Sequence, residues 1–309
     1  MQIVEETLSK LHIGDPTAFE GLAMFPLLGG SGTAADPGYA TLDEALERGS
    51  ARVTEIGEGG SVPELLFENL GEHPVLLLDG EELVGAKQNR VLNLTILAPA
   101  AEVVTIPVSC VEAGRWGYRT RSFRGAGRAQ YARGRARKAG SVSASLREGS
   151  RHSDQGEVWD DIRAKSERMG VSSPTAAMAS LFDAEHGRLD DFVAALRPVA
   201  GQRGAVFAIG GRVAGLELFD HPRTLAASLP KIVRSYALDA VEERGADAGA
   251  ADLEPAARRF VERVAAAPFQ SYLAVGIGSD LRLDAEGLAG GGLEAEGRLV
   301  HLCVFAAQC

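Results

Sequence analysis

The feature that most constrains the fold of this 309-residue chain is strict alternation of apolar and polar residues in two short segments. Residues 91–97, VLNLTIL, place a large apolar side chain at every second position, and residues 104–108, VTIPV, repeat the pattern. Alternation with a period of two predicts β-strands that bury one face. Pro107 has no N–H to donate to a neighbouring strand, so the second strand is expected at an edge or a bulge.

The rest of the chain divides into a β-rich part and a mixed part. Short apolar segments separated by Gly and Pro fill the first 120 residues, which is typical of a sandwich or barrel. Helical patterns follow at 158–169, 189–196, 225–241 and 255–266, and 205–219 forms a predicted hairpin that turns on Gly210 and Gly211. We therefore predict an α+β fold, in which a β-rich (sandwich- or barrel-like) N-terminal half precedes helices packed on a second, mainly antiparallel sheet. The expected division is a β-rich domain 1–122, a basic Gly/Arg/Ser-rich crossover 123–155 and an α+β domain 156–309.

Cysteine usage and hydropathy indicate the compartment. The three cysteines, Cys110, Cys303 and Cys309, are widely spaced and form no CxxC motif. No apolar run approaches the roughly 18 residues that a membrane span requires, and the first residues lack the pattern of a signal peptide. The sequence therefore predicts a reduced, cytoplasmic protein with no membrane partner.

Charge is distributed unevenly along the chain. The net charge is -10, yet nine Arg and Lys residues and no acid lie between Arg115 and Lys138, so the remainder carries about -19. Such a segment either folds back on the acidic body or binds an anion. Because Gly125, Gly127 and Gly134 disfavour a helix, we expect a solvated loop there, with an anion site as the alternative. The negative total argues against general nucleic-acid binding.

The stretch LDGEELVGAKQNRVLN, residues 78–93, carries unusually many polar groups for a connection between strands. If the strand at 91–97 continues backwards, Arg90 and Gln88 face the core while Lys87 and Asn89 face outward. A buried guanidinium needs a carboxylate, for which the expected order is Glu82, Glu81, then Glu112. Two interpretations stay open: an ion-pair network that fixes strand register, or a polar pocket at the end of the β-rich half.

Four segments resemble one bacterial family: 78–93, IPVSCVEAGRW (106–116), SVSASLRE (141–148) and KIVRSYALDAV (231–241). The family is named for its association with ADP-ribosylglycohydrolases and rhodanese-phosphatase-superfamily proteins and is a domain of unknown function. The resemblance implies work on NAD-derived or ADP-ribose-type ligands. The polar motif positions that it makes candidates are Glu81, Glu82, Lys87, Gln88, Asn89, Arg90, Ser109, Glu112, Arg115, Trp116, Ser143, Ser145, Arg147, Lys231, Ser235 and Tyr236.

Several candidates have a structural alternative. Trp116 is typical of a core or hinge anchor, but in a nucleotide site its ring would cover an adenine. Lys231 and Ser235 share a helix face and either decorate a surface or line a cleft between the halves. In an extended chain Ser143, Ser145 and Arg147 face the same way, which suits phosphate oxygens, although a plain loop explains them equally.

Two functional hypotheses follow. In the first, the protein is an enzyme, for instance a hydrolase of NAD or ADP-ribose metabolism, that acts on a phosphate-bearing small molecule. Arg115 and Arg147 would bind phosphate, and Glu81, Glu82 or Glu112, beside Lys87, would act as general base or as ligands to Mg²⁺ or Mn²⁺. In the second, a non-catalytic ligand-sensing or protein-interaction module uses the same pocket. Single-stranded nucleic acid along the Arg-rich segment is the weaker third hypothesis. No dedicated metal motif is present, and the sequence leaves the cofactor and the oligomeric state undetermined.

Overall fold

The computed structural model describes residues 2–29, 36–243, 250–283 and 285–306 of the chain. The glycine-rich residues 30–35 and Cys309 lie outside the described residues. No helix in the described ranges has the length and apolar character needed to cross a membrane.

The first half of the chain forms a closed six-stranded barrel. Its strands, in spatial order, are β11 (Val103–Cys110), β6 (Glu64–Asn69), β5 (Ala51–Glu55), β12 (Phe123–Ala129), β8 (Glu81–Gly85) and β9 (Arg90–Leu92). β11 pairs with β6 up to Pro107 and with β9 from Val108 onward, so the proline lies where the strand changes partner. Side chains of β5, β6, β9 and β11 fill the interior, which confirms the alternation at 104–108.

A small three-stranded sheet and one short helix adjoin the barrel. The sheet has the order β10 (Ile96–Ala98), β7 (Val75–Leu77), β4 (Ala40–Thr41). Helix α2 (Leu42–Glu47) begins directly after β4 with a capping box between Thr41 and Glu44, which satisfies two backbone N–H groups at once. Residues 93–95 are not strand, so the expected continuous strand at 91–97 is in fact β9 and β10 with a break between them.

The other half is a nine-stranded antiparallel sheet. Its order is β1 (Leu11–Ile13), β3 (Leu22–Gly29), β13 (Gln202–Ile209), β14 (Arg212–Phe219), β18 (Arg298–Ala306), β17 (Leu288–Ala295), β16 (Ser279–Leu283) and β15 (Phe269–Leu273), with β2 (Thr17–Phe19) paired to β3. β13 and β14 form the predicted hairpin, and Gly210 and Gly211 both have positive φ. The predicted α+β class with a second antiparallel sheet is confirmed.

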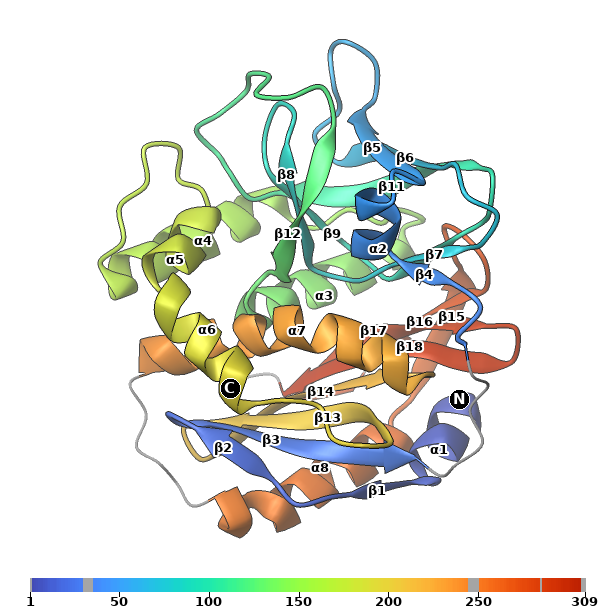
Figure 1. Ribbon diagram of the computed structural model, residues 1–309, viewed down its shortest axis with the longest axis vertical. Helices are drawn as coiled ribbons and strands as arrows, with labels where there is room; N and C mark the ends of the chain where they lie inside the picture. Colours follow the sequence, from blue (N-terminus) through green and yellow to red (C-terminus); the bar gives the residue numbers. More distant parts are fainter. Residues whose placement is uncertain (1, 30–35, 244–249, 284, 307–309) are drawn as a thin grey trace.

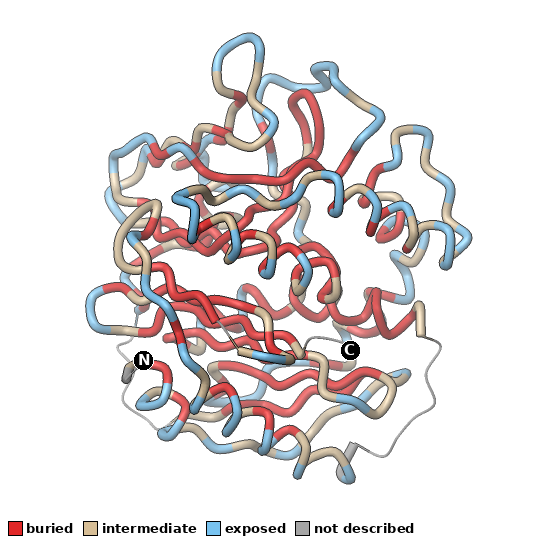
Figure 2. The backbone as a smooth tube through the Cα atoms, turned by 180° about the vertical axis from the view of Figure 1, so that it is seen from behind, coloured by how far each residue is buried: buried red, intermediate tan, exposed pale blue. Residues whose placement is uncertain are grey.

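Helices cover both faces of this sheet. Helices α1 (Gln2–Leu8) and α8 (Glu254–Ala266), the latter after a short 3₁₀ turn (Ala250–Leu253), pack on one face. On the other face, α7 (Pro222–Glu243) and α3 (Ala132–Arg147) lie between the sheet and the barrel (Figure 1). Helices α4 (Gln155–Met169), α5 (Ala179–Ala184) and α6 (His186–Ala195) close one side. Buried backbone runs through the barrel, the helix layer and the sheet, and exposed backbone gathers in the outer loops (Figure 2).

The basic segment does not form the expected solvated loop. Residues 123–129 are barrel strand β12 and 132–147 are helix α3, with Gly134 inside the helix. From Arg128 onward its cations fold back on the acidic body, in ion pairs such as Arg128–Glu82 and Arg135–Glu217, whereas Arg119, Arg121 and Arg124 are exposed. The boundary expected at residue 122 falls between β11 and β12, two strands of one barrel, while β1–β3 belong to the sheet built mainly by the second half.

Candidate functional site

The structure brings half of the predicted candidates together at the outer end of the barrel. The β8–β9 connection carries Lys87, Gln88 and Asn89, and the segment after β11 carries Glu112 and Arg115. Asn89 N–H donates to Glu112 Oε2 at 3.2 Å, and Gln88 Nε2 donates to the Glu112 carbonyl at 3.0 Å. Both faces of the β8–β9 connection are covered, so Lys87 and Asn89, expected to face outward, are buried.

Arg115 is the hub of this barrel-end cluster. Its Nη2 donates to Glu112 Oε2 at 2.6 Å and to Asn89 Oδ1 at 3.1 Å, and its Nη1 donates to the Ala86 carbonyl at 2.7 Å. Burial raises the pKa of Glu112, but the hydrogen bonds from Arg115 and Thr175 lower it more, so the carboxylate stays ionised. With these donors engaged, Arg115 is a structural clamp on the two loops.

Arg90 is fully buried, as the strand parity predicts, but the expected carboxylate partner is not there. Its Nη1 donates to Gln88 Oε1 at 3.0 Å, while Nε and Nη2 make no hydrogen bond within the described structure. The three expected partners are engaged elsewhere: Glu81 with Lys231, Glu82 with Arg128, and Glu112 with Arg115. Burial lowers the pKa of Arg90.

Trp116 lies on the surface of this cluster. The alternative interpretation of Trp116 as a core anchor is therefore wrong. Its side chain is 49% exposed, and Tyr118 is 53% exposed. The Lys87 ammonium lies 5.1 Å from the centroid of the Trp116 ring and 5.0 Å from that of Tyr118, so one cation holds both rings. Lys87 itself is fixed by the carbonyl oxygen of Glu58 at 2.7 Å.

The candidates on helix α7 lie between the two halves of the molecule. Lys231 Nζ is 2.5 Å from Glu81 Oε1 of the barrel and 2.5 Å from Asp43 Oδ2 of α2. Ser235 Oγ donates to the Gln130 carbonyl at 2.6 Å. Tyr236 stacks on Phe207 at 4.2 Å between ring centroids. All three side chains are buried and decorate no surface: Lys231 and Ser235 tie the helix layer to the barrel and its following segment, and Tyr236 packs on the sheet.

The row Ser143, Ser145 and Arg147 is not extended, because all three residues lie in helix α3. Ser143 and Arg147 are four residues apart and share a helix face, whereas Ser145 lies on another. Ser145 Oγ donates to the carbonyls of Val142 and Ser150. The geometry proposed for a phosphate grip is therefore wrong. Ser109, another motif position, donates from Oγ to Asn93 Oδ1 at 2.6 Å inside the barrel wall.

Sequence reasoning missed a buried charge network between the sheet and the barrel. Arg135 Nη1 is 2.6 Å from Glu217 Oε1, and Lys138 pairs with Asp79. His301 Nε2 lies 3.2 Å from Glu217 Oε2. Arg135 and Lys138 are three residues apart on α3 and so share one face, a signal that would have been available had the segment been predicted as a helix.

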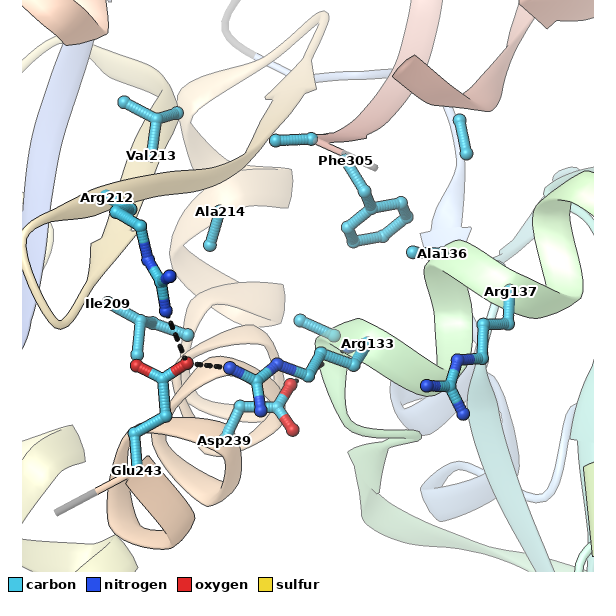
Figure 3. Close-up of a pocket in the computed structure, with 13 residues that line it drawn as sticks. Arg133, Ala136, Arg137, Ile209, Arg212, Val213, Ala214, Asp239, Glu243 and Phe305 are labelled. Atoms are coloured by element: carbon cyan, nitrogen blue, oxygen red, sulfur yellow. Dashed lines mark hydrogen bonds and ion pairs between the residues drawn. The ribbon is translucent and has the colours of Figure 1, made fainter. Parts of the chain in front are cut away.

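A cavity of about 480 Å³ opens where the start of α3, the end of α7 and the β13–β14 hairpin meet. Figure 3 shows Arg133 and Arg212 both directed toward Glu243, with Arg137 across the cavity and the Phe305 ring between them. Its apolar lining comes from strands β13, β14, β17 and β18 and from α3. We call this site the α3–α7 cavity, and its apolar members are Ala132, Ala136, Ile209, Val213, Ala214, Ala289, Phe305 and Ala306.

The polar lining of the α3–α7 cavity is mainly cationic. Arg133 and Arg212 both pair with Glu243, and Arg137 pairs with Asp161 outside the lining. The second lining carboxylate, Asp239, is already engaged, since it accepts from Lys165 Nζ at 2.7 Å and from the Arg133 backbone N–H at 2.9 Å. The positive end of the α3 dipole also lies here. The Arg137 and Arg212 side chains are 54% and 73% exposed, so each can turn toward a ligand.

Neither the α3–α7 cavity nor the barrel end is a recognisable metal centre. Across the described residues, no group of three or more His, Cys, Asp or Glu side chains is placed to hold a metal ion. None of the cavity arginines was a sequence candidate, although Arg133 and Arg137 lie in the basic segment.

Comparison with known proteins gives one match. The model of the family described as ARG and Rhodanese-Phosphatase-superfamily-associated Protein domain matches residues 10–305. No curated protein and no solved structure gives a significant match.

Proposed function

The chain belongs to the ARG and Rhodanese-Phosphatase-superfamily-associated Protein domain family, and from that premise we propose that it binds a phosphate-bearing small molecule in the α3–α7 cavity. The observation that carries the proposal is the composition of this cavity. Three guanidinium groups, from Arg133, Arg137 and Arg212, line a space of about 480 Å³ whose remaining lining is apolar apart from the carboxylates of Asp239 and Glu243. That volume is within the range of small-molecule sites, which are mostly apolar with a few convergent polar groups.

The chemistry of the lining favours phosphate over other anions. A guanidinium group can donate two parallel hydrogen bonds to two phosphate oxygens. Three such groups supply more donors than the Glu243 carboxylate can accept. Glu243 holds Arg133 and Arg212 together, so an incoming phosphate would exchange a carboxylate partner for a dianionic one. The apolar lining around Phe305 suits the part of the ligand that carries no phosphate, such as a planar base or a sugar. A nucleotide or an ADP-ribose-type compound has both parts.

The ion pairs of the candidate bases support ligand binding without catalysis. Glu81, Glu82 and Glu112, the candidate bases, are buried against Lys231, Arg128 and Arg115 and do not line the cavity. The lining carboxylates Asp239 and Glu243 also have cationic partners.

A thermal-shift and calorimetry panel tests the proposal. ADP-ribose, NAD, ADP and AMP are compared with adenosine and ribose, which lack phosphate. A ligand present at a hundred times its dissociation constant stabilises the folded state by about 2.7 kcal/mol. We expect a shift from at least one phosphate compound, weakened by added salt, and none from adenosine or ribose. Turnover of the hit, followed by chromatography, should be undetectable.

Arg137→Gln and Arg212→Gln should remove the shift. Both side chains are more than half exposed, and each carboxylate partner keeps a second donor, Tyr131 Oη for Asp161 and Arg133 for Glu243, so the unliganded protein should melt only slightly lower than before. Arg163→Gln is the matched control, because Arg163 is equally exposed and pairs with Asp160 on α4, away from the cavity. A shift that survives both cavity variants, or the absence of any shift across the panel, would rule out the α3–α7 cavity as a phosphate site.

A further inference from the structure

A second surface, independent of the α3–α7 cavity, lies at the outer end of the barrel. The connection between β11 and β12 runs beside the β5–β6 and β8–β9 connections there (Figure 1). Five exposed side chains belong to it, and we call them the 116–124 surface: Trp116, Tyr118, Arg119, Arg121 and Arg124.

The two aromatic rings of the 116–124 surface are held in place with a free side. Lys87, buried beneath them, lies about equally far from both ring centroids and is itself anchored by the carbonyls of Glu58 and Gly59. The Arg90 guanidinium lies 5.6 Å from the Trp116 centroid as a second cation. The Trp116 ring therefore contacts two buried cations and the Tyr118 ring one, and each residue still leaves about half of its surface to solvent. A ring fixed in this way is a ready platform for another planar group.

The three arginines add positive charge to the same stretch of chain, within eight residues of Trp116. Arg121 and Arg124 are exposed, and within the described chain neither makes an ion pair. Arg119 has only a long contact, 3.7 Å, to Glu112, which Arg115 already engages. The one opposing charge on an adjoining loop is the exposed Glu58, whose carbonyl accepts from Lys87 and Tyr118.

We infer that the 116–124 surface binds single-stranded nucleic acid. Unpaired bases stack on exposed aromatic faces, and phosphates pair with the surrounding guanidinium groups. Duplex nucleic acid presents its bases edge-on in the grooves and cannot stack on these rings. An acidic peptide would meet the arginines but would leave both rings unused. The net charge of -10 on the whole chain repels polyanions at long range, so binding depends on contact and falls steeply with salt.

Tryptophan fluorescence gives a direct test. The chain has two tryptophans, so in a Trp159→Phe background all tryptophan emission comes from Trp116. Titration with a single-stranded RNA of about eight nucleotides, within the site size of comparable surfaces, should quench this emission because a base stacks on the ring. With three arginines in contact, the logarithm of the affinity should fall with the logarithm of salt with a slope of about -2.

Substitutions separate stacking from charge. Fluorescence anisotropy of a labelled RNA should show about tenfold weaker binding for Trp116→Ala, and Trp116→Phe should restore most of it. Arg121→Gln with Arg124→Gln should weaken binding and flatten the salt slope, whereas Arg121→Lys with Arg124→Lys should keep that slope. Glu58→Gln should strengthen binding, because it removes the opposing charge. Arg258→Gln with Arg259→Gln, an equal change of net charge on α8, should leave binding unchanged.

The proposal is overturned by any of three results. RNA without effect on Trp116 emission at low salt would exclude stacking. Equal binding of a polyglutamate peptide, undiminished by Trp116→Ala, would show that the surface serves an acidic protein segment. Competition between RNA and the phosphate ligand, or loss of RNA binding in Arg212→Gln, would mean that RNA uses the α3–α7 cavity. A circular dichroism spectrum of each variant confirms that it is folded.

Discussion

Replacing Lys231 with Met should destabilise the protein by about 3 kcal/mol, because Lys231 joins the barrel to the helix layer through a buried ion pair. Lys231 is 5% exposed, and its Nζ lies 2.5 Å from oxygens of both Glu81 and Asp43. Burial lowers the pKa of Lys231, but the two carboxylates raise it more, to about 12 from an ordinary 10.5. One pKa unit is worth about 1.4 kcal/mol, so the folded state favours the ammonium by about 2 kcal/mol.

The loss in Lys231→Met should exceed that figure. Met keeps the chain length but leaves the Glu81 carboxylate, 3% exposed, with the Leu78 N–H as its one remaining hydrogen-bond donor among the described residues. Removing one partner of a buried pair costs about 3–5 kcal/mol, and protonation of Glu81, whose pKa burial already raises, limits the loss to the lower end. Lys231→Met combined with Glu81→Gln should recover part of it, because no buried charge remains.

Urea unfolding followed by circular dichroism measures the effect. The matched control is Arg258→Met, which breaks a Glu254–Arg258 pair of similar length, 2.6 Å, between half-exposed side chains and should cost less than about 1 kcal/mol. The contribution of Lys231 is fully present below pH 10.5 and is lost as pH rises through about 12, since the folded-state pKa is the higher one. A loss of less than about 1 kcal/mol in Lys231→Met, or one equal to the control, would refute the buried-pair reasoning.

Three further predictions concern the other buried polar groups. Arg90→Met should leave the urea midpoint unchanged or raise it, because the guanidinium that it removes has two unbonded nitrogens and no carboxylate among the described residues; a loss above about 2 kcal/mol would contradict this. Burial, with Asp79 and Glu217 beside it, raises the pKa of Cys303 to about 12, so iodoacetamide followed by mass spectrometry should leave Cys303 unmodified in the folded protein and label it after unfolding. Burial raises the pKa of Asp79 and of Glu217, but Lys138 and Arg135 lower them more, so the melting temperature should fall as pH drops below about 4, and Asp79→Asn should reduce that dependence.

Where local pattern alone decides the structure, the sequence predicts it well. Val104, Ile106, Val108 and Cys110 are all buried, as their shared parity requires. Helix α4 ends at Gly170, whose φ of 66° is the left-handed conformation that stops a helix. The barrel-end cluster was also predictable in part, because its members occupy two short segments of the chain. The antiparallel pairing of β9 with β11 then brings these segments together.

Gly134, in the basic segment, shows why helix α3 and the α3–α7 cavity could not be predicted from the sequence. Gly134 suggested a helix breaker, yet it lies inside α3, where a Cβ would come within 2.8 Å of Gln130 Nε2 and Tyr131 Cε2. The glycine therefore permits close packing at the start of the helix. The ion pairs on the buried face of α3 offset the low helix propensity of glycine. That face depends on Glu217, 82 residues from Arg135 in the chain, and no local pattern carries such information. The α3–α7 cavity is hidden for the same reason, since it draws on six separate elements.

The chain has 27 arginines against 5 lysines. Their exposure and their carboxylate partners distinguish structural arginines from ligand-binding ones, whereas the local density of charge along the chain does not. Arg128 and Arg135 lie in one basic segment with Arg124, but both meet carboxylates that are themselves buried. Substituting Arg135 should therefore lower the free energy of unfolding and affect ligand affinity only through loss of folded protein. Substituting Arg124 or Arg212 should leave the unfolding midpoint nearly unchanged and lower affinity for one ligand each. If Arg212→Gln instead unfolded the protein while Arg135→Gln affected only binding, exposure would be the wrong criterion, and both binding proposals would lose their physical basis.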